Sequence, residues 1–179
     1  MGTSKIVSSV KKQQELISEG LHQAVIADVV LVENVETSWG LQTQVRLQWL
    51  TDQLGTQPEN KGKRLPVWSQ YRASLHEKSK LRGVLFKILG YDPGPTFDVE
   101  QLVGTNAMLI VEHNENEGIV YSNVSLRGAG ILKLAKGQTP ISVPADFVRF
   151  EDRQNKQGGK KPGASSAAAP ASSDAAEGM

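Results

Sequence analysis

The segment from Arg64 to Leu89 constrains the fold more than any other part of this sequence. Its first part alternates apolar and polar residues, which predicts a half-buried strand. The apolar positions there are Leu65, Val67 and Tyr71. Its second part has apolar residues at offsets of three and four, which predict an amphipathic helix. These are Leu81, Val84, Leu85, Ile88 and Leu89. Ser79, or the earlier Ser74, is the expected N-cap of this helix, and Gly90 is its expected end.

The rest of the chain between the two polar ends reads mainly as strand. Residues 42–50 show the clearest alternation, with Val45, Leu47 and Trp49 on one side and Arg46 on the other. Residues 97–104 suggest a short helical turn, and 114–118 a hairpin loop. Short edge strands are possible at 131–134 and 147–150. The other expected strands are 22–32, 106–113 and 119–126.

Three strands, one helix and two strands predict a mainly β fold. This order matches a five-stranded OB-fold-like Greek-key barrel, in which the helix lies between the third and fourth strands. We expect this domain to occupy residues 20–150. A split β-sandwich and an SH3-like barrel are the alternatives, but neither accounts as well for one helix of this length in mid-chain.

The two ends of the chain are polar and poor in large apolar residues. Residues 1–19 predict an N-terminal arm, either a weak amphipathic helix or a disordered segment. Residues 151–179 are rich in Lys, Gly, Ala, Ser and Pro, a composition that favours disorder. The acidic end of this tail, with Asp174 and Glu177, resembles the partner-recruiting tips of bacterial single-strand-binding proteins. It lacks their aromatic residue, so a passive, solubilising tail is the alternative.

Composition excludes several classes of protein. The chain has no cysteine, so disulfides and thiolate metal sites are absent. It has no apolar run long enough to span a membrane and no signal-peptide pattern, so we expect a cytoplasmic protein. The three histidines come from separate segments without ligand spacing, and no nucleotide-binding or nucleophile motif is present. We therefore expect neither an enzyme nor a cofactor.

Charge is unevenly distributed along the chain. Residues 59–87 contain eight Lys and Arg against two Glu, whereas residues 91–126 contain six acidic residues and no Lys or Arg. Such segregation favours a one-sided basic face. The alternative is that the two segments lie side by side and neutralise each other.

Single-stranded nucleic acid is held by aromatic platforms and by cations that contact phosphates. In the predicted strand, Trp68 shares its parity with Arg64 and Arg72, opposite the apolar positions. Alternatively, Pro66 breaks this register and Trp68 is buried. Acidic residues in the 114–117 loop argue against DNA on that side. The alternative for Lys78, Lys80 and Arg82 is a solvated helix face, which is the commoner fate of such residues. The candidate nucleic-acid-binding residues are Trp39, Arg46, Lys61, Lys63, Arg64, Trp68, Arg72, Lys78, Lys80 and Arg82.

Several short motifs resemble those of a family of small phage and prophage proteins. Residues 74–81 fit the pattern Ser-Leu-His-x-Lys-Ser-x-Leu, and Phe97-Asp98 and a Leu-x-Gly at 102–104 follow. A strand pair with His113 and a Gly-x-x-Tyr-x-Asn pattern at 118–123 completes the resemblance, which covers most of residues 20–126. It implies a phage replication or recombination accessory that binds single strands, and it supplies no functional residues.

The sequence thus predicts a non-enzymatic protein of a bacterial host cytoplasm that binds single-stranded DNA with low sequence preference. Replication or recombination proteins and further copies of the chain are possible partners. The alternative is a protein–protein adaptor or structural oligomer built on the same barrel.

Overall fold

This computed structural model describes residues 13–125 and 130–157. The chain divides into two units between Phe147 and Val148. The second unit contains helix α2 (Phe150–Gln157), where the sequence predicted a disordered tail from residue 151. The two acidic residues in its first turn and Lys156 in its last turn suit the helix dipole. The edge strand expected at 147–150 does not form; the remainder of the tail and residues 1–12 lie outside the described residues.

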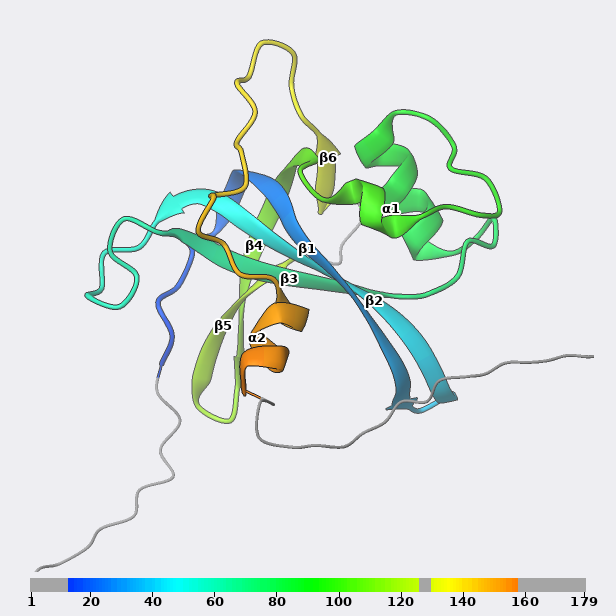
Figure 1. Cartoon of the computed structure of the whole chain (residues 1–179), viewed down its shortest axis with the longest axis horizontal. Coiled ribbons are helices and arrows are strands. Elements are labelled where there is room, and N and C mark those ends of the chain that lie inside the picture. Colours follow the sequence, from blue (N-terminus) through cyan, green and yellow to red (C-terminus); the bar gives the residue numbers. More distant parts are fainter. Residues whose placement is uncertain (1–12, 126–129, 158–179) are drawn as a thin grey trace, which may run out of the picture. The chain divides into compact units, whose positions relative to one another are not determined.

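The first unit is built on one antiparallel sheet (Figure 1). Its strand order is β3-β2-β1-β4-β5, and β6 pairs with β4. The mainly β prediction is confirmed, but within the described residues the sheet has six strands rather than five because the short segment near 131 pairs with β4. The strands are β1 (Gly20–Thr37), β2 (Gly40–Leu54), β3 (Arg64–Arg72), β4 (Asn106–Asn116), β5 (Ile119–Val124) and β6 (Ile131–Lys133).

Helix α1 (Lys80–Leu89) lies between β3 and β4 in the chain, as predicted. Ser79 is its N-cap: the hydroxyl accepts a hydrogen bond from the backbone N–H of Arg82 at 3.2 Å. Gly90 ends the helix with a φ of 83°, a left-handed conformation that glycine adopts without steric cost. The helix buries Leu81, Leu85 and Ile88. The helical turn predicted near 97–104 is the 3₁₀ helix η1 (Val99–Leu102).

The hairpin between β1 and β2 is longer than the sequence predicted. Residues 33–40 separate two predicted strands and were expected to form a loop, but β1 continues to Thr37 and β2 begins at Gly40. Two irregularities in β1, at Ile26/Asp28 and at Val32/Val35, shift the register while pairing continues. The β4–β5 loop is likewise reduced to a tight turn at Glu117 and Gly118, both with positive φ.

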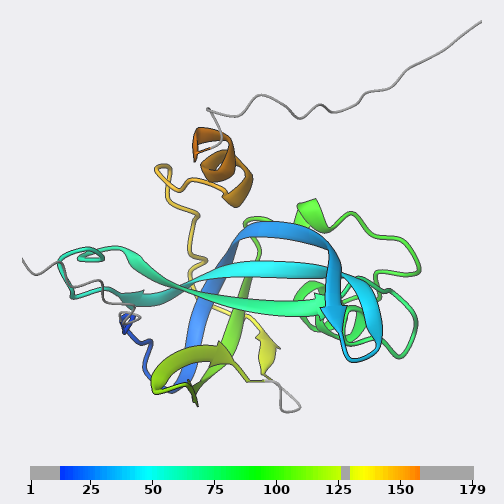
Figure 2. The same ribbon diagram turned by 90° about the horizontal axis from the view of Figure 1, so that it is seen from below.

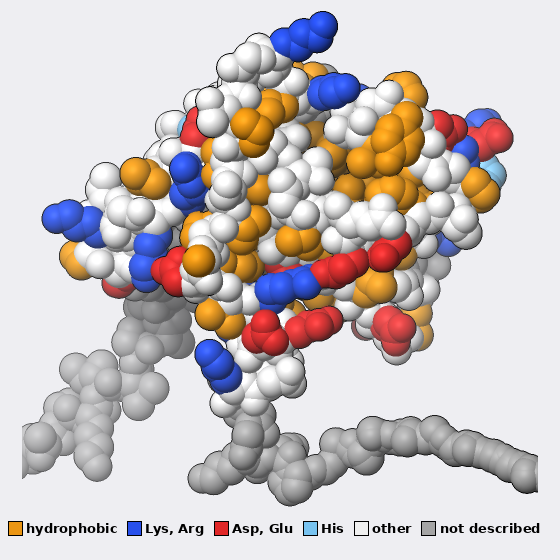
Figure 3. Space-filling model, turned by 45° about the horizontal axis from the view of Figure 1, so that its top comes forward, with side chains coloured by type: hydrophobic (Ala, Val, Ile, Leu, Met, Phe, Trp, Pro, Cys, Tyr) orange, Lys and Arg blue, Asp and Glu red, His pale blue; other side chains and the backbone are white. Residues whose placement is uncertain are grey.

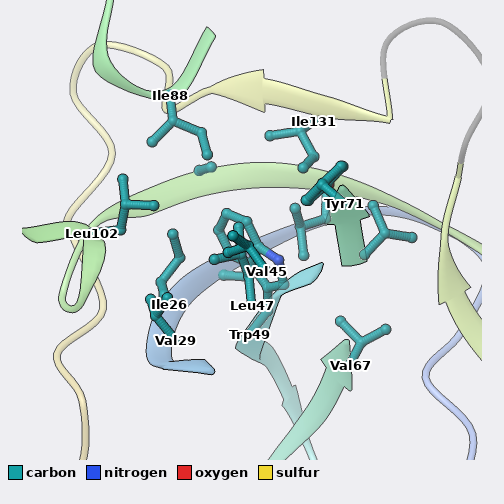
Figure 4. Packing of buried hydrophobic residues seen from close by; sticks show 14 of the residues in the cluster. Ile26, Val29, Val45, Leu47, Trp49, Val67, Tyr71, Ile88, Leu102 and Ile131 are labelled. Atoms are coloured by element: carbon teal, nitrogen blue, oxygen red, sulfur yellow. The ribbon is translucent and has the colours of Figure 1, made fainter. Parts of the chain in front are cut away.

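The hydrophobic core lies on the inner face of the sheet, against α1 and η1. Trp49 is 0% exposed, as predicted for a core residue, and its indole N–H donates to the Ser69 hydroxyl at 2.9 Å. Figure 4 shows Val45, Leu47 and Trp49 of β2 at the centre of the cluster.

Part of the outer face of the sheet is also covered. A second, smaller cluster packs Val25, Ala27 and Leu50 against a later segment that contains Ile141 and Phe147. This region of the outer face is therefore closed to a ligand. The outer face of β3 carries no such cover among the described residues: Pro66, Trp68, Gln70 and Arg72 are exposed.

Residues 13–19, which we term the strap, close the end of the core opposite α1 (Figures 1 and 2). Ile17 in the strap is 1% exposed and belongs to the main core cluster. Its backbone N–H donates to the Ser122 hydroxyl at 2.9 Å, and its carbonyl accepts from His113 Nε2 at 2.6 Å. Helix α1 and the strap thus seal the two ends of the same core.

A further set of bonds fixes the strap to the β2–β3 connection. The carboxylate of Glu15 accepts from the backbone N–H of Thr56 at 2.6 Å and from its hydroxyl at 2.8 Å. These bonds, led by the Thr56 backbone N–H, lower the pKa of Glu15.

Neither α1 nor α2 has the length and apolar character that a membrane-crossing helix requires.

Candidate nucleic-acid interface

A cleft of about 1100 Å³ opens where β3, the β3–α1 connection and the β4–β5 hairpin come together. One wall is formed by β3 and the connection, and the other by β4 and β5. The first wall presents Trp68, Gln70, Arg72, His76, Lys78 and Lys80. The second wall presents Glu112, Asn114 and Asn123.

The first wall combines an aromatic ring with three cations. Trp68 lies opposite Gln48 in the β2–β3 ladder and is 38% exposed, while Val67 and Ser69 on either side of it are buried. The predicted parity is therefore correct, and Pro66 does not break it. Within the described residues, the side chains of Arg72, Lys78 and Lys80 have no ion-pair or hydrogen-bond partner. Four of the ten candidates thus meet in one cleft.

The second wall was missed by sequence reasoning. Glu112 and Asn123 face each other directly in the β4–β5 ladder. In the sequence, Glu112 counted only as one of the six acidic residues in 91–126, and Asn123 belonged to the motif at 118–123. Their place in the cleft depends on β5 lying near β3, a contact between segments about fifty residues apart that no local pattern indicates.

The remaining candidates lie outside this cleft. Trp39 is 88% exposed at the turn between β1 and β2. Arg46 is half-buried on the outer face of β2, and its Nε has no hydrogen-bond partner in the described part of the chain. Lys61 and Lys63 are exposed in the β2–β3 connection, and Arg64 begins β3.

Near the end of β3 that is farther from the cleft lie three cations, Lys61, Lys63 and Arg64. At about 3.3 Å per residue, the eight steps from Arg64 to Arg72 span roughly 26 Å. Arg64 Nη1 also donates weakly to the carbonyl of Thr51 at 3.4 Å. Basic groups therefore lie at both ends of β3, with Trp68 midway between them.

Arg82 is engaged elsewhere. Its Nε and Nη2 donate to the two carboxylate oxygens of Asp92, each at 2.9 Å, and its Nη1 donates to the carbonyl of Leu75 at 3.0 Å. The Arg82 hydrogen bonds, followed by one from the backbone N–H of Gly94, lower the pKa of Asp92 to about 2. At this point the basic and acidic segments neutralise each other, which is the alternative that the sequence left open.

Figure 3 shows how charged side chains are distributed on one face of the molecule. Its Lys and Arg side chains are interspersed with acidic, hydrophobic and uncharged groups. The described residues therefore form no continuous positive surface on that face. The geometry points to a local site in the cleft instead.

A Ser18–His22–Asp52 arrangement resembles a hydrolytic triad but lacks its chemistry. His22 Nδ1 lies 2.7 Å from Asp52 Oδ1, and Nε2 lies 3.2 Å from the Ser18 hydroxyl. The same Nε2 lies only 2.7 Å from the carbonyl oxygen of Ser18, an acceptor that requires an N–H there. A general base needs a free lone pair at that atom. The arrangement instead anchors the strap to the sheet.

No protein-family model matches this sequence, and no curated protein shows a significant match.

Proposed function

We propose that this chain is an OB-fold protein that binds single-stranded DNA with little sequence preference, in phage-type replication or recombination. The order of the first five strands supports the barrel, since β1 pairs with both β2 and β4 and the helix lies between β3 and β4. β3 also lies close to β5, which is the approach that closes such a barrel.

One observation carries the proposal: the exposed ring of Trp68 shares a cleft with three cations that have no partner among the described residues. Base stacking on an aromatic ring contributes about 1–3 kcal/mol per base and tolerates any base. Arg72, Lys78 and Lys80 supply the charge that phosphates require. Neither stacking nor phosphate contact distinguishes one base strongly from another, so we expect a low sequence preference.

A strand lying along β3 would meet cations at both ends. Arg72, Lys78 and Lys80 would contact it at the cleft, and Lys61 and Lys63 would contact it at the β2–β3 connection. The acidic side chains at the tip of the β4–β5 hairpin disfavour a path in that direction. We therefore place the strand on the β3 side, with Trp68 near its centre.

The salt dependence of binding tests this proposal. A labelled strand of mixed sequence, about 16 nucleotides long to match the upper site size of one such domain, is titrated with the protein at several salt concentrations, and fluorescence anisotropy is measured. Log K should fall linearly with log salt, by about 0.7 for each phosphate that a cation neutralises. The double variant Arg72→Gln with Lys80→Gln should bind more weakly, with a slope shallower by about 1.4.

Lys136→Gln is the matched control, because Lys136 is exposed and lies outside the cleft. It should leave the slope nearly unchanged. Absence of binding at low salt would overturn the proposal. An unchanged slope in the double variant would remove the cleft from the binding site.

A second candidate is a protein–protein adaptor or structural oligomer. It is favoured by the β1–β2 hairpin, where Leu31, Trp39 and Leu41 are all exposed. Isolated exposed apolar residues are common, but three on one hairpin suit a contact surface. Light scattering would show a defined oligomer that Leu41→Ser weakens, and nucleic-acid binding would be absent.

A further inference from the structure

Glu112 is the one carboxylate among the described residues that line the cleft. Its side chain is half-exposed and has no hydrogen-bond or ion-pair partner in residues 13–125 and 130–157. If the cleft bound only phosphates, the negative charge of Glu112 would repel them and weaken binding. The position of Glu112 therefore needs a reason other than phosphate binding.

The two walls of the cleft differ in chemistry. The β3 wall offers an aromatic face and cations, whereas the second wall offers the carboxylate of Glu112 and the side-chain amides of Asn114 and Asn123. A base stacked on Trp68 covers the indole with one face and directs its hydrogen-bonding edge sideways, towards groups that line the cleft. Carboxylates and amides are the groups that hydrogen-bond such edges.

An ionised carboxylate only accepts hydrogen bonds, so it distinguishes bases by their donors. Guanine presents two adjacent donors on its Watson–Crick edge, the ring N1–H and the 2-amino group, which match the two oxygens of one carboxylate. Adenine and cytosine present one amino donor beside an acceptor nitrogen. Thymine presents one N–H between two carbonyl oxygens, which would repel the carboxylate.

We propose that Glu112 is a specificity-determining residue that favours a guanine base at the Trp68 position of the cleft. This inference rests on the proposed function and refines it. The rest of the bound strand is held through phosphates and stacking, so overall sequence preference stays low. One position of the strand prefers guanine.

Three strands of equal length, about 12 nucleotides, test this: all thymine, thymine with one central guanine, and thymine with one central inosine. Inosine keeps N1–H and lacks the 2-amino group. Their affinities for the full chain are compared at one low salt concentration. A good bidentate contact gives roughly tenfold discrimination, so the guanine strand should bind about tenfold more tightly than all thymine. The inosine strand should fall between them.

The Glu112→Gln variant should bring the guanine and inosine strands within about twofold of each other. It should bind all thymine at least as tightly as the wild type, because a negative charge has left the cleft. Glu115→Gln is the control: Glu115 is exposed on the same strand and does not line the cleft, so the guanine preference should persist.

The possible failures are distinguishable. If none of the three strands binds, the proposed function is overturned and this inference with it. If all three bind equally to the wild type, single-strand binding stands and guanine selection is wrong. The inference is also wrong if Glu112→Gln changes every affinity by the same factor and leaves the guanine-to-inosine ratio intact. A thermal unfolding curve establishes that both variants are folded.

Discussion

Arg82 and Asp92 are joined by two parallel N–H···O hydrogen bonds of 2.9 Å, which tie helix α1 to the segment that follows it. The folded protein holds the pKa of Asp92 at about 2, below its ordinary value of 3.8. The pair therefore contributes its full stabilisation above about pH 4, and this contribution is lost as the pH falls towards 2.

The Asp92→Asn variant tests this relationship. It should be less stable than the wild type at about pH 5, and the difference in unfolding free energy should shrink at about pH 2.5, where the wild-type carboxylate has begun to protonate. Urea unfolding at the two pH values measures it. Asp146 is exposed and has no side-chain partner among the described residues, so Asp146→Asn should show only a small difference at both. A constant Asp92→Asn difference would contradict the prediction.

Truncation of Ile17 should destabilise the first unit strongly. Removing a fully buried aliphatic side chain typically costs about 2–5 kcal/mol, because the cavity that remains fills only partly. Ile17→Ala should lower the urea midpoint accordingly. Leu21→Ala, at a position that is 57% exposed, should change stability by less than about 0.5 kcal/mol. A loss below about 1 kcal/mol for Ile17→Ala would show that the strap is dispensable.

The three tryptophans should respond differently to single-stranded DNA. Stacking of a base on Trp68 should quench its fluorescence, while Trp49 in the core should be unaffected. Trp68→Phe should therefore remove most of the quenching, and Trp68→Ala should weaken binding by roughly tenfold, the loss of one stacked base. Trp39→Phe is the control and should keep the quenching. If Trp39→Phe abolishes it instead, the strand lies on the β1–β2 hairpin.

Local patterns in the sequence were enough to predict β3 and α1. Alternation placed Trp68 on the outer side of β3, and the spacing of Leu81, Leu85 and Ile88 predicted the buried face of α1. Ser79 and Gly90 marked the ends of the helix. In each case the residues that determine the structure lie close to one another in the sequence, within a few turns of one helix or a few positions of one strand.

The features that were missed depend on distant parts of the chain. Ile17 was one of several apolar residues in a segment predicted to be a weak helix or a disordered arm. No local pattern shows that its backbone forms hydrogen bonds with Ser122 and His113. Glu112 counted only as one acidic residue of the segment 91–126, because nothing local places it in a cleft with Trp68. Arg82 was a candidate phosphate contact, with a solvated helix face as the alternative, and no local pattern predicted its pairing with Asp92 ten residues further on.

The burial of Ile17 also sets an order of events during synthesis on the ribosome. Its partner Ser122 is made 105 residues later, which takes about 5–20 s at typical rates of translation. Until Ser122 has been made, Ile17 has no completed core to pack into. The end of the core that the strap closes then stays exposed to water and to chaperones. The strap is translated before every strand of the sheet, and it is therefore among the last parts to reach its final place.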